Sequence, residues 1–175
     1  MYKRQDLEHF LDQAIASSGF HGTMAVTSGV KNSGDAPEGI KVKEGSHRID
    51  VEPWPFAGED GEEPEFSHDP HVWTSPKQAK IQVENIVEEL ATKAPSVKEA
   101  GASYEKQLED LDAWAAKSLG AIPREDRVLF TSHDAFGYFA NAYDVTFIGS
   151  ALSDFNNQQD ATASHIDEAA RTVRE

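Results

Sequence analysis

Two short segments of the sequence each place one histidine in a turn between expected regular elements. The first reads Asp-Pro-His-Val-Trp at 69–73, and the second reads Ser-His-Asp-Ala-Phe-Gly-Tyr-Phe at 132–139. A neutral imidazole nitrogen is the commonest protein ligand for metals. Two such turns can hold one metal ion between His71 and His133, if the fold brings them together.

The same residues also allow an interpretation without a metal. His71 can be a turn histidine packed under Trp73, with Pro70 fixing the backbone. His133 can be a buried imidazole at the end of a strand, with Asp134 either as a helix cap or as the partner that orients a metal ligand. The spacing of the residues alone does not decide between these interpretations.

The other five histidines are weaker candidates. His68 lies three residues before His71, beside a run of acidic residues, and is a candidate for weak metal binding in a loop. The remaining four are expected to be structural or solvated, because a lone histidine is more often a surface or hydrogen-bonded residue than a ligand. They are His9, His21, His47 and His165.

The composition restricts the class of protein. Among the 175 residues, 16 are basic and 31 are acidic, which gives a formal net charge of −15. Such a charge repels nucleic acid and anionic lipid and attracts cations. The absence of cysteine excludes thiolate sites, so any metal must bind through nitrogen and oxygen. No apolar run approaches the ~18 residues that a transmembrane helix needs.

The elements that would position the histidines follow from the apolar pattern. Ser75 and Pro76 predict the start of a helix directly after His71. The order strand, helix, strand, helix from 127 to 173 predicts a parallel sheet, with His133 at the carboxyl end of a strand, where such sheets bind ligands. Helices are expected at 7–15, 76–90, 96–119, 135–143 and 161–173, and strands at 23–27, 127–131 and 145–148.

Two further regions carry weaker signals. Residues 29–67 are expected to be mostly loop, and their acidic run at 59–65 is interpreted as a solvated, mobile segment. The aromatic residues that follow His133 are expected in the core of the short helix; they are Phe136, Tyr138 and Phe139.

The two histidine segments resemble those of a known family. Asp-Pro-His-Val-Trp-Thr-Ser-Pro-Lys at 69–77, followed by a helix and later by Ser-His-Asp-Ala-Phe-Gly-Tyr-Phe-Ala at 132–140, is similar to the zinc and manganese substrate-binding proteins of ABC transporters. The likeness covers most of the chain, from Leu-Glu-His-Phe-Leu at 7–11 to the final helix. Two long motifs in the right order are far more specific than a lone histidine.

The resemblance implies an α/β fold of two lobes with parallel sheets, joined by one long connecting helix and incomplete at both termini. A divalent ion, Zn²⁺ or Mn²⁺, is implied to lie in the cleft between the lobes, where His71 and His133 match two ligand positions. The implied division is an N-terminal lobe at 1–95 with the long acidic loop 29–67, a connecting helix at 96–120, and a C-terminal lobe at 121–175.

A third ligand is implied near the end of the chain. The family usually has a segment resembling Ser-Thr-Glu where this sequence reads Ser-Asp-Phe-Asn-Asn-Gln-Gln-Asp at 153–160. Asp160 is the candidate, with Gln158 as the alternative alignment and a helix cap as the alternative role of Asp160. Family members also have an earlier segment and final strands with further ligands, so the sequence is expected to be a fragment that lacks both ends.

The implied function is capture of the ion outside the cytoplasm, in the periplasm or on a membrane anchor, and delivery to an ABC permease without catalysis. The family includes lipoproteins with a role in cell adhesion. One alternative is a metal-assisted hydrolase in which His71 and His133 bind zinc and Glu65 or Asp134 acts as base. The sequence has no His-Glu-x-x-His helix and no Gly-x-Ser-x-Gly elbow. A second alternative is a structural or adhesive domain without a metal.

Overall fold

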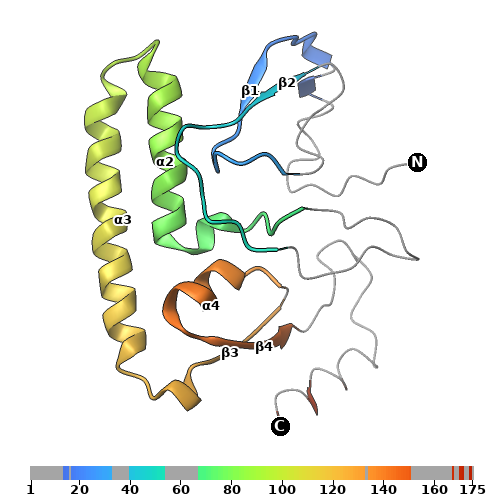
Figure 1. Ribbon diagram of the computed structural model, residues 1–175, viewed down its shortest axis with the longest axis vertical. Coiled ribbons are helices and arrows are strands. Elements are labelled where there is room, and N and C mark those ends of the chain that lie inside the picture. The colour runs from blue at the N-terminus through green and yellow to red at the C-terminus, as the bar shows by residue number, and fades with distance from the viewer. Residues whose placement is uncertain are drawn as a thin grey trace.

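Two long helices that lie side by side, α2 and α3, are the largest elements of the fold (Figure 1). The computed structural model describes residues 14–15, 17–32, 40–53, 67–132, 134–150, 167, 170–171 and 174. Helix α2 runs over Pro76–Ala91 and α3 over Val97–Gly120. Proline stands at the start of α2, where its missing N–H costs no helical hydrogen bond.

Gly101 determines how closely α2 and α3 approach. This residue is buried in α3, and a Cβ atom at its position would lie 2.3 Å from Cγ2 of Val87 in α2. Any larger side chain would therefore push the two helices apart. The exposed rim of the same contact carries an ion pair, with Lys80 Nζ 2.9 Å from Glu109 Oε1.

Two small parallel sheets complete the described fold. The first pairs β1 (Thr23–Ala25) with β2 (Lys41–Lys43). The second pairs β3 (Val128–Thr131) with β4 (Thr146–Ser150), and helix α4 (Gly137–Tyr143) connects these two strands. Parallel strands need such a crossover. Two 3₁₀ helices, η2 (Val72–Thr74) and η3 (Arg124–Asp126), precede α2 and β3.

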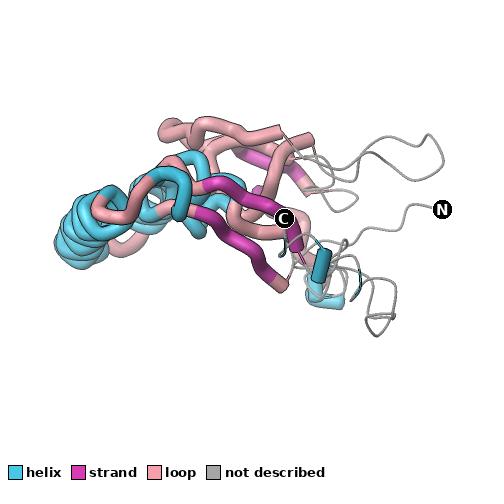
Figure 2. Tube along the Cα trace, turned by 90° about the horizontal axis from the view of Figure 1, so that it is seen from below, coloured by secondary structure: helices cyan, strands magenta, loops and turns pink. Residues whose placement is uncertain are grey.

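The two sheets lie at opposite ends of the helix pair. Strands β1 and β2 lie beside the upper part of α2, whereas β3, α4 and β4 lie near the lower end of α3 (Figure 1). Seen from below, α2 and α3 form one side of the molecule and the strands extend away from them (Figure 2). The described residues therefore have the expected fold class, α/β with parallel sheets joined by one long helix.

A buried cluster joins the parts of the chain that surround the first histidine segment. It consists of Ile49 after β2, Val72 in η2 and Tyr138 in α4, with Val30 and Ile81 packed against them. Burial of these apolar side chains is the main favourable term that holds α4 against the start of α2.

Asn85 attaches two loops to α2. Its side chain is buried, and its amide nitrogen donates to the carbonyl oxygens of Thr27 at 2.8 Å and His47 at 2.7 Å. Its Oδ1 accepts the N–H of His47 at 3.1 Å. Gly29 lies under the same loop with a φ of +76°, and a Cβ atom there would lie 1.8 Å from the oxygen of His47. Glycine is the residue that this close approach allows.

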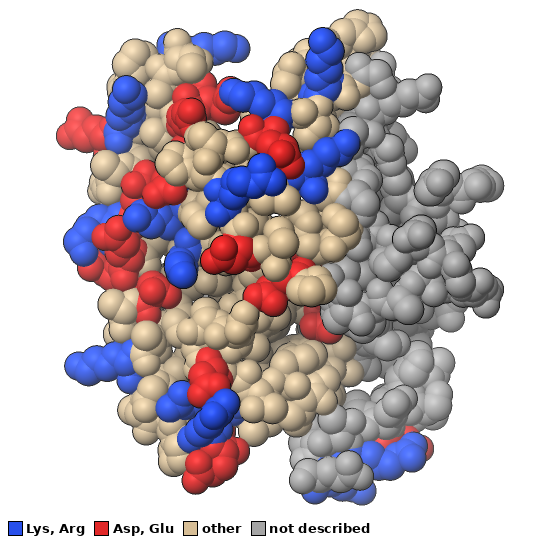
Figure 3. Space-filling view, in the orientation of Figure 1, with Lys and Arg blue, Asp and Glu red and all other residues tan. Residues whose placement is uncertain are grey.

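The face of the molecule in Figure 3 carries mixed charges. Basic and acidic side chains alternate over the part of this face that the structure describes. Exposed ion pairs among the described residues include Arg48 with Glu44 at 3.1 Å and Lys106 with Asp110 at 2.5 Å. The acidic excess of the whole sequence is therefore not gathered into one patch among the described residues of this face.

Most of the expected elements are confirmed, with ends that differ by a few residues. The expected strands match β1, β3 and β4, and the expected helices at 76–90, 96–119 and 135–143 match α2, α3 and α4. Ser75 precedes α2 as expected, but its side chain makes no capping hydrogen bond. Gly120 is the last residue of α3 rather than the residue after it.

The expectation of loop structure over 29–67 missed β2. A three-residue strand between glycine-rich stretches has too short a pattern to recognise, and its pairing with β1 identifies it. The acidic run at 59–65 and most of the first expected helix lie outside the described residues, although Ala14 and Ile15 are helical. Of the last expected helix, Asp167, Ala170 and Arg171 are described, and they are helical.

Candidate metal centre

The first histidine segment forms a buried turn that leads into η2. The exposed fraction is 5% for Asp69 and 3% for His71. The amide of Val72 donates to the carbonyl of Pro70 at 2.8 Å, and both the amide and the hydroxyl of Thr74 donate to the carbonyl of His71. A proline and three local hydrogen bonds thus hold the backbone around the imidazole.

Asp69 orients the imidazole of His71. Oδ1 of Asp69 lies 2.7 Å from Nδ1 of His71 and also accepts the backbone N–H of His71 at 2.8 Å. An ionised carboxylate only accepts, so the shared proton is placed on Nδ1. The other ring nitrogen, Nε2, then has the lone pair that can bind a metal. A carboxylate on the far nitrogen is the usual support of a metal-binding histidine.

Asp69 is itself held by neighbouring segments. Its N–H donates to the carbonyl of Glu52 at 2.9 Å, and its own carbonyl accepts the hydroxyl of Tyr138 at 2.8 Å. Tyr138 was expected only as helix core, and its hydroxyl was missed. The residue type could have indicated this contact, because a buried tyrosine hydroxyl normally finds a hydrogen-bond partner.

Trp73 lies at the mouth of this turn. Its ring meets that of His71 edge-on, with centroids 5.5 Å apart, and the residue is 51% exposed. This ring contact is the one that the interpretation of His71 without a metal assumed, and it does not exclude a metal ligand. About half of the Trp73 surface is exposed, whereas His71 is buried.

The other candidate ligands are not all described. His133 and Asp160 lie outside the described residues, as do His9, His165 and Glu65. Within the described part of the chain, no three side chains of the histidine, cysteine, aspartate or glutamate type gather into a group able to hold a metal. The described centre therefore consists of one oriented imidazole and the carboxylate behind it.

His68 is tied into the fold rather than exposed in a loop. Its backbone accepts the side-chain amide of Asn32 at 2.8 Å, and its Nδ1 lies 3.4 Å from the hydroxyl of Ser67. Burial lowers the pKa of His68, and the neighbouring charge of Asp69 opposes that effect. These contacts indicate a structural histidine, which stays neutral to lower pH than a solvated one.

Two other histidines match the expectation of surface or structural roles. His21 is exposed. His47 is about half exposed, and its Nδ1 lies 3.2 Å from Oε2 of Glu84. Neither residue contacts the turn that carries His71 among the described contacts.

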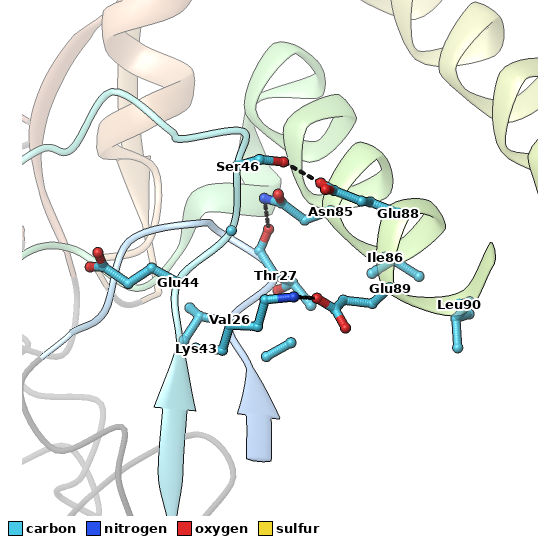
Figure 4. A pocket seen from close by; sticks show the side chains of 12 residues that line it. Val26, Thr27, Lys43, Glu44, Ser46, Asn85, Ile86, Glu88, Glu89 and Leu90 are labelled. Carbon is cyan, nitrogen blue, oxygen red and sulfur yellow. Dashed lines mark hydrogen bonds and ion pairs between the residues drawn. The ribbon is translucent and has the colours of Figure 1, made fainter. Parts of the chain in front are cut away.

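A separate cavity of about 410 Å³ lies at the carboxyl ends of β1 and β2, against α2 (Figure 4). Its floor is apolar, and its rim is crossed by the Lys43–Glu89 ion pair and the Ser46–Glu88 hydrogen bond. None of the lining residues belongs to the turn at 69–75. The cavity is therefore not the metal centre.

Comparison with known proteins identifies the family. The model of the family "zinc-uptake complex component A, periplasmic" matches residues 1–175. The chain belongs to this family. Among its relatives, the zinc-binding protein TroA of Treponema pallidum is 35% identical over 116 residues, which are 64% of this chain and 36% of TroA.

Other relatives carry the same kind of name. The manganese ABC transporter substrate-binding lipoprotein PsaA of Streptococcus anginosus is 30% identical over 123 residues, which are 66% of this chain and 38% of that protein. A solved structure of TroA is 34% identical with a TM-score of 0.53, over 66% of this chain and 41% of TroA. The chain thus spans less than half the length of these relatives.

The relatives are named as metal-binding and transport proteins, and not as enzymes. The alternative of a metal-assisted hydrolase therefore does not describe this family. Within the part of the chain that the structure describes, no helix is both long and apolar enough to cross a membrane.

Proposed function

We propose that this chain is part of an extracytoplasmic binding protein that captures Zn²⁺ or Mn²⁺ and delivers it to an ABC permease. The observation that carries the proposal is the buried pair in which Oδ1 of Asp69 lies 2.7 Å from Nδ1 of His71. An imidazole held in one orientation by a buried carboxylate suits a site that binds a metal ion and releases it unchanged.

The proposed ligands are His71, His133 and Asp160. Two imidazole nitrogens and a carboxylate oxygen suit zinc, and manganese accepts the same donor set with more oxygen ligands. The relatives that support this proposal include both a zinc-binding and a manganese-binding protein. The ion is the cargo of the protein, so the site must bind and release it.

The proposed arrangement has an N-terminal lobe at 1–95, a connecting helix at 96–120 and a C-terminal lobe at 121–175. Support comes from α3, which runs over Val97–Gly120 between the two parallel sheets. The proposed location is the periplasm or the outer side of a membrane to which the protein is anchored, because several relatives are named as lipoproteins.

Titration calorimetry with zinc and with manganese tests the proposal. We expect the purified chain to bind at least one of the two metals, and the variants His71→Ala and His133→Ala to lose that binding. The matched control is His47→Ala, because His47 is half exposed and lies against Glu84 instead of the turn.

Loss of binding in the two ligand variants with retention in the control supports the proposal. A folded chain that binds neither metal, or that binds equally well after His71→Ala, contradicts it. Circular dichroism of each variant establishes that the chain is folded before the titration is interpreted.

A further inference from the structure

Helix α4 contacts the turn that carries His71 through one buried hydroxyl. The hydroxyl of Tyr138 donates to the carbonyl oxygen of Asp69 at 2.8 Å and accepts the backbone N–H of Glu52 at 3.2 Å. Glu52 and Asp69 are in turn linked by a backbone hydrogen bond of 2.9 Å. The three residues therefore form a closed network around Asp69.

Two neighbours on α4 strengthen this contact. Gly137 lies so close to the turn that a Cβ atom at its position would be 3.0 Å from Oδ2 of Asp69. Asn141, one helical turn further on, donates from Nδ2 to Oε1 of Glu52 at 2.5 Å. Helix α4 thus contacts both Asp69 and Glu52, the two residues that the backbone hydrogen bond joins.

The environment of Tyr138 makes its hydrogen bonds independent of ordinary pH changes. The residue is 2% exposed, and burial raises its pKa to about 12, although the N–H of Glu52 acts in the opposite direction. The hydroxyl therefore keeps its proton and can donate to Asp69 throughout the physiological range. A buried hydroxyl without partners would be costly, which favours this single arrangement.

The position of α4 in the chain links both histidine segments. The helix begins at Gly137, four residues after His133, and its side chains contact Asp69, two residues before His71. The contact between α4 and the turn therefore connects the Asp69–His71 turn to the segment that follows His133 in the chain.

We propose that Tyr138 is a positioning residue for metal binding, whose hydroxyl holds the Asp69–His71 turn against the helix that follows His133. This inference rests on the proposed metal-binding function. It assigns to Tyr138 an effect on the geometry of the bound ion, exerted through Asp69 and without contact with the ion. Gly137 leaves the space that this arrangement needs.

The experiment compares Tyr138→Phe with Tyr143→Phe in the 175-residue chain. Tyr143 is a matched control, because it lies on the same helix, is buried, and donates its hydroxyl to Oδ1 of Asp112 at 2.8 Å, away from the turn. Zinc affinity is measured by calorimetry. The visible spectrum of the chain saturated with Co²⁺ reports the coordination geometry, which a loss of folding stability alone would not change.

We expect Tyr138→Phe to bind zinc about tenfold more weakly and to alter the Co²⁺ spectrum, whereas Tyr143→Phe keeps wild-type affinity and spectrum. Wild-type affinity and spectrum in Tyr138→Phe overturn the inference and leave the proposed function intact. A wild-type chain that binds no metal overturns the proposed function, and the inference with it.

A second variant keeps the test decisive if Tyr138→Phe does not fold. Gly137→Ala adds one methyl group 3.0 Å from Oδ2 of Asp69 and leaves the hydroxyl of Tyr138 in place. We expect weaker zinc binding and an altered Co²⁺ spectrum, because the carboxylate must shift. Unchanged binding and spectrum in this variant overturn the inference.

Discussion

At the scale of single residues, the candidate centre depends on one carboxylate that serves two groups. Oδ1 of Asp69 accepts both the backbone N–H and the ring N–H of His71, so it holds the position of the residue and the orientation of its ring. Both residues are buried, and solvent screens the interaction only weakly. Removal of the charge at Asp69 should therefore affect metal binding more than removal of an exposed charge.

Asp69→Asn tests this dependence on the carboxylate. We expect zinc affinity to fall by about tenfold or more, because a neutral amide is a weaker acceptor for the imidazole N–H than a carboxylate. Calorimetry measures the change. Asp50→Asn is the control, since Asp50 is exposed and the substitution removes the same charge. Equal affinity in the two variants would contradict the role of Asp69.

The lowered pKa of His68 should make the free energy of unfolding depend on pH. Because burial lowers its pKa, the folded chain binds this proton less readily than the unfolded chain. The unfolded chain takes up the proton as the pH falls through about 6.5, so the free energy of unfolding decreases below that pH. We expect His68→Gln to lose less stability than the wild type between about pH 7.5 and about pH 5.5.

Thermal unfolding of the metal-free chain measures this pH dependence. The control is His21→Gln, which removes an exposed histidine in place of a buried one. If His68→Gln and the wild type lose stability in parallel as the pH falls, His68 is not responsible for the effect.

At the scale of elements, the packing of α2 on α3 depends on one small residue. A Cβ atom at Gly101 would lie 2.3 Å from Cγ2 of Val87, a short and stiff side chain that cannot easily move aside. Gly120 at the end of the same helix has no neighbouring atom within 4 Å of such a Cβ. Alanine at Gly101 therefore tests close packing and helix propensity together, whereas alanine at Gly120 tests helix propensity alone.

Gly101→Ala should destabilise the chain by about 1–3 kcal/mol, because the clash with Val87 exceeds the gain in helix propensity. Gly120→Ala should leave stability unchanged or slightly higher. Urea unfolding measures both. The double variant Val87→Ala with Gly101→Ala should recover part of the loss, since the two side chains then fit together. A stabilising effect of Gly101→Ala alone would contradict the packing argument.

At the scale of the whole molecule, a metal bound by both histidine segments would stabilise the folded state of the chain that contains both of them. Binding to the folded state alone adds about 2.7 kcal/mol when free metal is about 100 times the Kd. For a chain of this size we expect Tm to rise by roughly 5–10 °C with the preferred metal.

The linkage requires both proposed ligands. His71→Ala and His133→Ala should therefore each abolish the rise in Tm, although they lie in different segments of the chain. Differential scanning calorimetry with and without metal measures the effect. A rise that persists in either variant would show that the ion binds elsewhere.

Local sequence determined most of the described elements and predicted the type of metal ligand. The helices at α2 and α3 carry long apolar patterns, and Pro76 marks a start that needs no tertiary contact. His71 was recognisable because the Asp-Pro-His turn and the following helix are encoded within a few residues. The absence of cysteine already restricted the predicted metal chemistry to nitrogen and oxygen ligands.

Tertiary structure decided the contacts that join distant segments. Strand β2 exists because β1 pairs with it, and three residues alone have too weak a preference to predict it. The hydroxyl of Tyr138 reaches Asp69 across 69 positions of the chain, and Asn85 reaches His47 across 38. Such hydrogen bonds depend on where helices pack, which no local pattern contains. The bond from Tyr138 holds the turn in which Asp69 orients the imidazole of His71.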